Sequence, residues 1–297
     1  MAKTSWQQQR ERGSALGIGI LFATARLLGR RAARFVLAFV TFYFLLTAGA
    51  ARRSSRQYLR RALGRAPGWR DLWLHFWCFS GCALDRVFLL AGGKEIEVQI
   101  ELADEVLAIG RRGGALLMVS HFGSFEAMRT SGIRQAEVPL AILMDRAHGA
   151  RITQALERVA PDFSAQVIDA DQPGPSLVLK LRETLAAGKL VGMMVDRARA
   201  GEATESVDFL GAPARFPLGP WQLAVALRCP VIVGYAVPCG GRKYLARFEL
   251  FSTGLEAARG QRGELAREAM QRYAEWLARQ ARSAPYNWFN FYDFWAE

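Results

Sequence analysis

Two short apolar runs after residue 110 each end in polar side chains. The run 115–119 (ALLMV) leads to His121, and the run 190–195 (LVGMMV) leads to Asp196 and Arg197. Both runs are too short for a typical globular helix and are apolar on consecutive residues, as in a strand that is covered on both faces. The pattern therefore predicts buried strands that deliver polar groups at their C-terminal ends.

Strand and helix patterns alternate from residue 95 onward, with no internal repeat and no low-complexity linker. Further strands are expected at 96–100, 138–144, 166–168 and 230–237, and helices at 102–110, 152–159, 173–188, 221–227 and 264–282. Such alternation predicts an α/β fold with a mixed, largely parallel central sheet covered by helices. We expect residues 66–297 to form one catalytic domain.

The segment after the first buried run places a histidine close to a carboxylate. Ser124 is an expected N-cap residue, so Glu126 falls in the first turn of a new helix. On one continuous helix, His121 and Glu126 would point about 140° apart. Across a corner from strand to helix they can meet.

Such a meeting would give a base and its orienting group. A carboxylate at Glu126 would accept the Nδ1 proton of His121, fix the tautomer and leave Nε2 free to take a proton from a substrate. The carboxyl ends of strands in an open α/β sheet are also where ligands commonly bind. The alternative is an ordinary structural pair with no chemistry.

Residues 1–65 carry the whole net charge of the protein. This part has 13 Lys or Arg and one acidic residue, while the remainder has 26 basic and 26 acidic residues. The seventeen residues 35–51 are uncharged and have arginines on both sides, which is near the lower limit for crossing a bilayer. Because the positive-inside rule places both basic flanks in the cytoplasm, we favour a monotopic helical hairpin on anionic lipids over a single span.

Other features of the sequence exclude several kinds of site. The four cysteines have no metal-binding spacing, so no metal is expected and the thiols are interpreted as core residues of a reducing compartment. No signal peptide is recognised. His75, among aromatic residues, is expected in a core or at a membrane surface, and Asp85 with Arg86 as a local pair. There is no G-x-S-x-G elbow, no P-loop and no dinucleotide fingerprint.

The segment HFGSFE (121–126) matches the H-x4-D/E signature of the lysophospholipid acyltransferase superfamily, and it resembles the branch of late acyltransferases in lipid A biosynthesis. That branch has a similar order of later segments, with an Asp-Arg after a strand and F-x-G-x-P-A before a helix. Here these are Asp196-Arg197 and 209–217 (FLGAPARFP). The resemblance covers most of the chain.

The resemblance implies a set of site residues. His121 and Glu126 would be catalytic, and the substrate-binding residues would be Gly123, Ser124, Arg146, Asp196, Arg197, Phe209, Gly211, Pro213 and Arg215. Arg197 and Arg215 have the fork geometry to bind a phosphate, whereas an internal pair of Asp196 with Arg197 is the open alternative. Residues 198–205 are small and polar, as expected of a mobile substrate loop.

The C-terminal segment 285–295 (PYNWFNFYDFW) resembles the family's terminal Pro-x-x-Trp motif but then departs from it. Together with 6–13 (WQQQRERG), the departure resembles acyltransferases that accompany aryl-polyene and xanthomonadin-like pigment synthesis. This departure argues against lipid A itself as the acceptor.

The resemblance implies a membrane-associated acyltransferase at the cytoplasmic face of the inner membrane. The donor would be an acyl thioester of acyl carrier protein or coenzyme A, and the acceptor a hydroxyl or amine of a lipid or glycolipid, with no cofactor and no nucleic-acid partner. His121 would act as general base, and backbone N–H groups at Gly123 or a nearby arginine would bind the oxyanion. Alternatives are a glycerophospholipid or ornithine-lipid acyltransferase and a non-enzymatic membrane scaffold.

Overall fold

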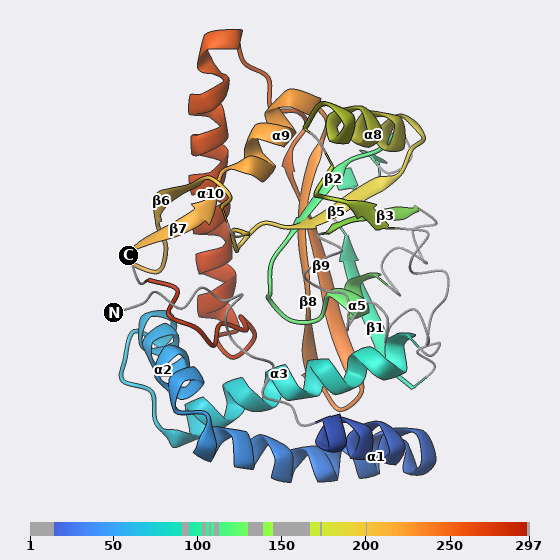
Figure 1. Cartoon of the computed structure of the whole chain (residues 1–297), viewed down its shortest axis with the longest axis vertical. Coiled ribbons are helices and arrows are strands. Elements are labelled where there is room, and N and C mark those ends of the chain that lie inside the picture. The colour runs from blue at the N-terminus through green and yellow to red at the C-terminus, as the bar shows by residue number, and fades with distance from the viewer. Residues whose placement is uncertain are drawn as a thin grey trace.

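A seven-stranded sheet forms the centre of the protein in a computed structural model (Figure 1). The structure describes residues 15–90, 95–102, 105–106, 108–109, 113–129, 139–144, 167–172, 174–199 and 201–295, with side chains from residue 29 onward. The strands in sheet order are β1 (Glu97–Leu102), β9 (Lys243–Ser252), β8 (Val231–Gly240), β2 (Leu116–Val119), β5 (Leu190–Met194), β3 (Leu140–Met144) and β4 (Val167–Asp169). Among the described strand pairs of this sheet, β8–β9 alone is antiparallel, so the prediction of a mixed, largely parallel sheet is confirmed.

Helices lie around the sheet and across one of its ends (Figure 1). They are α1 (Ala15–Thr47), α2 (Gly49–Leu63), α3 (Trp69–Leu90), α5 (Phe125–Ala127), α8 (Gly174–Ala186), α9 (Gly219–Leu227) and α10 (Arg262–Ser283). A separate hairpin joins β6 (Thr204–Asp208) to β7 (Pro213–Pro217). The expected helices at 173–188, 221–227 and 264–282 are present, whereas 152–159 and part of 102–110 lie outside the described residues.

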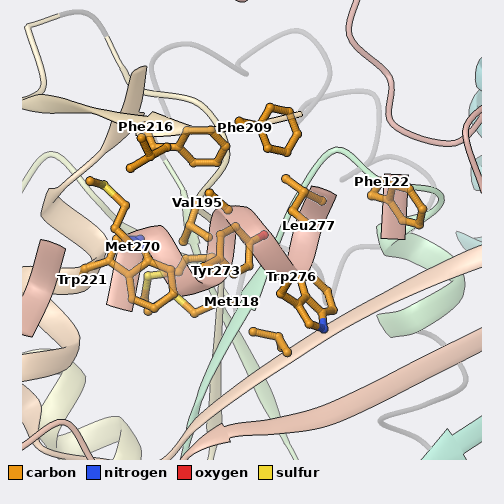
Figure 2. Packing of buried hydrophobic residues seen from close by; sticks show 14 of the residues in the cluster. Met118, Phe122, Val195, Phe209, Phe216, Trp221, Met270, Tyr273, Trp276 and Leu277 are labelled. Carbon is orange, nitrogen blue, oxygen red and sulfur yellow. The ribbon is translucent and has the colours of Figure 1, made fainter. Parts of the chain in front are cut away.

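Strand β2 shows why its sequence is apolar at every position. It lies between β5 and β8, and its four side chains are at most 2% exposed. Leu116 and Met118 belong to one hydrophobic cluster, while Leu117 and Val119 belong to the cluster on the other face. In Figure 2, Met118 packs beside α10 with Tyr273 and Trp276 nearby. Alternating side chains that each meet a covered face produce the continuous apolar run.

Three strands, β6, β7 and β9, were not expected from the sequence. Strand β9 alternates buried and more exposed side chains and pairs with β8 after a turn at Gly241-Arg242. Strand β6 includes Thr204 and Glu205, so the loop expected at 198–205 is shorter than predicted. All three strands carry charged side chains at exposed positions, which hides them from a search for apolar runs.

The N-terminal helices form a bent arrangement against α3. Helix α1 has a break in its helical backbone at Gly29, and its second part meets α2 at an angle of 91°. Among the described helices none is alone long and apolar enough to cross a membrane, although this bent pair passes the same test by length and composition. The side chains of Tyr58 and Leu59 in α2 are fully buried in the same cluster as the sheet. A boundary near residue 65 stays a prediction.

A buried ion pair fastens α1 to α3. The carboxylate of Asp85 accepts hydrogen bonds from Nε and Nη2 of Arg30, each at 2.7 Å, and from the hydroxyl of Tyr244 at 2.9 Å. Arg34 lies 3.6 Å from the same carboxylate. The expectation that Asp85 pairs locally with Arg86 is therefore wrong, because successive residues of a helix point in different directions.

Replacing Asp85→Asn should lower the free energy of unfolding by about 3–5 kcal/mol, because it leaves the Arg30 guanidinium buried beside a neutral group. Chemical denaturation measures the loss. Glu101→Gln is the matched control, since Glu101 pairs with Arg247 on an exposed part of the sheet and should change stability by no more than about 1 kcal/mol. Equal losses in the two variants would contradict a special role for the buried pair.

Candidate active site

The loop after β2 is held between strand β8 and the C-terminal segment. The N–H of Gly123 donates to the carbonyl of Asn287 at 2.8 Å, and the carbonyl of His121 accepts from the N–H of Phe289 at 2.8 Å. On its other side, the N–H of Ser124 donates to the carbonyl of Ala236 at 2.7 Å. The loop that carries His121 is thus fixed by backbone bonds to two separate parts of the chain.

Gly123 is required by this close approach. Its φ of +73° is in the left-handed region, and a Cβ at this position would lie 2.0 Å from the carbonyl oxygen of Ala236. Only a glycine allows both the turn and the contact. Ser124 follows as the N-cap of α5, and its Oγ accepts from the N–H of Ala127 at 3.2 Å. The N-cap prediction is confirmed.

His121 pairs with Asp196, which follows β5. Nδ1 of His121 lies 2.9 Å from Oδ1 of Asp196, and the backbone N–H of His121 donates to Oδ2 at 3.1 Å. Because β2 and β5 are parallel neighbours, their C-terminal ends bring the two residues together. Asp196 is fully buried, whereas the side chain of His121 remains 31% exposed. The two buried runs of the sequence thus end in one site.

The expectation that Glu126 orients His121 is wrong in this structure. The Glu126 carboxylate is 3% exposed and accepts from Nη2 of Arg86 on α3 at 2.7 Å, with Arg129 at 3.4 Å. Glu126 does lie in the first turn of α5, as predicted. The side chain turns towards α3, where it links α3 to α5, and the position next to Nδ1 is taken by Asp196.

The surroundings set the protonation of this pair. Burial lowers the pKa of His121, the charge of Arg197 lowers it further, and the carboxylate of Asp196 opposes both. Although burial alone raises the pKa of Asp196, the nearby His121 and Arg197 bring it below its ordinary value. At neutral pH the geometry therefore favours a neutral imidazole with its proton on Nδ1, facing an ionised carboxylate.

Arg197 is held by internal contacts. Its Nη2 donates to the carbonyl of Phe289, its guanidinium lies 5.1 Å from the ring centre of Tyr292, and its Nε lies 3.9 Å from Oδ2 of Asp196. These contacts favour the internal alternative that the sequence left open. They also place a positive charge next to the His121–Asp196 pair.

The other residues that the sequence predicts to bind substrate lie on the β6–β7 hairpin, except Arg146. Phe209 is fully buried among Phe216, Trp288 and other aromatic rings. Gly211 forms the hairpin turn, and its N–H donates to Oδ1 of Asp208. Pro213 begins β7, and the exposed Arg215 donates to Oγ1 and the carbonyl of Thr204. Arg146 lies outside the described residues.

Two of the expected oxyanion donors are already engaged. The N–H groups of Gly123 and Ser124 donate to Asn287 and Ala236, so the turn at Gly123 does not offer them to a substrate.

Within the described part of the chain, no group of three His, Cys, Asp or Glu side chains is placed to hold a metal ion. His75 is fully buried, which agrees with the expected position in a core and not with one at a membrane surface.

The sequence of the chain matches one family of known proteins. The sequence model of the family described as bacterial lipid A biosynthesis acyltransferase matches residues 93–296. The chain belongs to this family. A search of curated proteins finds no match.

As a lipid A biosynthesis acyltransferase family member, the protein is an acyltransferase that acts in lipid biosynthesis, and the family implies an acyl donor and a lipid acceptor. The matched residues contain the whole central sheet, His121 and Asp196. Helices α1, α2 and α3 precede the match. The pair at the ends of β2 and β5 therefore lies within the family's own domain.

Titration of His121 can distinguish whether Asp196 or Glu126 influences its pKa. Asp196→Asn should lower the pKa of His121, since it removes the charge that stabilises the imidazolium. Glu126→Gln should leave that pKa nearly unchanged, because Glu126 bonds to Arg86 and Arg129. NMR titration of the three histidine rings measures both. A larger effect in Glu126→Gln would restore Glu126 as the orienting residue.

Proposed function

We propose that this protein moves an acyl chain from an acyl thioester, on acyl carrier protein or coenzyme A, to a hydroxyl or amine of a lipid or glycolipid. The observation that carries the proposal is the bond from Nδ1 of His121 to Asp196, which directs Nε2 away from the carboxylate. The side chain is partly exposed at the C-terminal end of a central strand. This is the geometry of a general base with its orienting group.

In the proposed reaction, Nε2 of His121 takes the proton of the acceptor O–H or N–H as that atom attacks the thioester carbonyl. The resulting tetrahedral intermediate loses the thiolate when its C–S bond breaks, and the proton on Nε2 can neutralise the leaving sulfur. Asp196 stabilises the transient imidazolium without taking its proton. No acyl-enzyme is formed, since the acceptor attacks the donor directly.

Among the described groups beside the His121–Asp196 pair, we favour Arg197 for stabilising the oxyanion. The N–H groups of Gly123 and Ser124 are engaged, whereas the positive charge of Arg197 lies beside the His121–Asp196 pair. A fixed charge at this place requires no reorganisation as negative charge develops. Because its Nη2 is bonded to Phe289, the same residue also keeps the C-terminal segment beside the site.

An exposed apolar face on α1 supports attachment to a membrane. Five large side chains on this face are more than half exposed, namely Phe35, Phe39, Phe42, Tyr43 and Leu46. Their spacing follows the helical period, so they form one stripe, while Leu37 and Leu45 face the protein. With the arginines of residues 31–61, the stripe suits a monotopic anchor on the cytoplasmic face of the inner membrane.

The acceptor is the finer part of the proposal. The sequence of the C-terminal segment 290–295 departs from the family's usual motif. The rings of Phe294 and Trp295, which belong to this segment, pack against Trp288. We favour an aryl-polyene-type lipid over lipid A for this reason. A glycerophospholipid or an ornithine lipid would use the same mechanism, and lipid mass spectrometry of a deletion strain distinguishes them.

Replacing His121→Ala should reduce acyl transfer by roughly 10²- to 10⁴-fold with little change in donor KM. In the unaltered protein, activity should rise with pH and reach half its maximum below pH 6.5, because the neutral imidazole is the active form and its pKa is lowered. Transfer of a radiolabelled acyl group from acyl carrier protein to extracted lipid measures both. Near-normal transfer by the His121→Ala protein would favour the scaffold alternative.

The stripe on α1 makes a separate prediction. Phe39→Ser combined with Phe42→Ser should weaken binding to vesicles of phosphatidylglycerol and phosphatidylethanolamine at least about tenfold, since each ring loses apolar burial. The effect should persist at high salt, where attraction to arginines is screened. Leu179→Ser on α8 is the matched control, because Leu179 is 60% exposed away from the stripe. Unchanged flotation of the double variant would place the anchor elsewhere.

A further inference from the structure

Trp288 touches the His121–Asp196 pair in two different ways. Its indole Nε1–H donates to Oδ2 of Asp196 at 3.0 Å. Its backbone pairs with Phe122 in an antiparallel bridge, whose bonds join Asn287 to Gly123 and Phe289 to His121. One residue therefore fixes the carboxylate through its side chain and the histidine loop through its main chain.

The contact with Asp196 completes the bonding of a buried charge. Oδ1 faces Nδ1 of His121, and Oδ2 accepts from the backbone N–H of His121 as well as from Trp288. Because Asp196 has no exposed surface, an acceptor position that lost its donor would lack a replacement from bulk water. The indole thus determines how firmly the carboxylate is held in the plane that suits His121.

Trp288 is held in place by His75 on α3. The carbonyl of Trp288 accepts from Nε2 of His75 at 2.8 Å, and Nδ1 of His75 lies 2.7 Å from Oγ of Ser55 on α2. A carbonyl only accepts, so the proton of His75 is on Nε2 and the Ser55 hydroxyl donates to Nδ1. Burial lowers the pKa of His75 to about 4, which keeps the ring neutral and this tautomer fixed.

We propose that Trp288 is a positioning residue for the His121–Asp196 pair and that His75 holds Trp288 in this role. The proposal rests on the proposed function and adds two residues that do not touch the substrate. It connects α2 and α3, outside the matched family domain, to the base within it. Its contribution is orientation, since neither residue exchanges a proton with the substrate.

Trp288→Phe tests the side-chain contact. The ring keeps its packing against Tyr58 and Phe209, but the donor to Asp196 is lost. We expect kcat to fall about tenfold with the donor KM unchanged. We also expect the pKa of His121 to rise, because a carboxylate with fewer donors stabilises the imidazolium more strongly. The other titratable groups near Asp196, namely Arg197, Tyr273 and Tyr292, are unaltered.

Trp276→Phe is the matched control. It also removes an indole bond to a carboxylate, from Nε1 of Trp276 to Glu249 at 2.9 Å, and the residue is 4% exposed. A similar loss of thermal stability in both variants, with the fall in kcat and the shift at His121 confined to Trp288→Phe, supports positioning. An unchanged pKa of His121 together with an unchanged kcat in Trp288→Phe would overturn it.

His75 provides a second test with a conservative replacement. His75→Gln places an amide N–H close to the position of Nε2, whereas His75→Leu removes the donor to Trp288. We expect kcat to fall in His75→Leu by about the same factor as in Trp288→Phe and to recover at least partly in His75→Gln. Equal activity of the two His75 variants would contradict the role assigned to this residue.

Failure of this inference is distinguishable from failure of the proposed function. If His121→Ala abolishes transfer while Trp288→Phe behaves as the unaltered protein, only the positioning role is wrong. If His121→Ala retains transfer, the general base itself is wrong. The NMR titration of His121 provides a readout that does not depend on the acceptor chosen for the assay.

Discussion

The carboxylate of Asp196 is the constraint on which the site depends. A charge without exposed surface is stable only if its oxygens are bonded and positive groups lie near it. Here His121 supplies two of the bonds, Trp288 supplies another, and Arg197 supplies a nearby charge. The loop after β2, the end of β5 and the C-terminal segment are therefore required to meet at one place, and the sheet order brings the first two together.

Much of the fold followed from apolar periodicity, because a strand covered on both faces leaves an unmistakable run of apolar residues. Strands β2 and β5 and helix α10 were located in this way. Strand β9 was missed since its exposed positions carry charges, so the alternation competes with a helical interpretation. The hydrophobic pattern records which positions are covered, and it is weakest where charged, exposed positions alternate with the buried ones, as in β9.

The site was predicted in part for the same reason. His121 and Asp196 each follow a buried run, and their shared position at strand ends was visible in the sequence. The partner of Nδ1 was assigned to Glu126 because it lies five residues away, whereas Asp196 is distant in sequence and close in space. Which of two carboxylates reaches a histidine depends on the sheet order and on the alternative partner of Glu126, Arg86, and neither follows from local spacing.

The C-terminal segment has a consequence for how the protein matures. Residues 287–289 follow every strand of the sheet in the chain, yet they form the backbone bridge that fixes the loop of His121. During synthesis the helices α1 to α3 leave the ribosome before the strands of the sheet. The histidine therefore reaches its final geometry only when residues 287–289 have been released, after every described strand of the sheet.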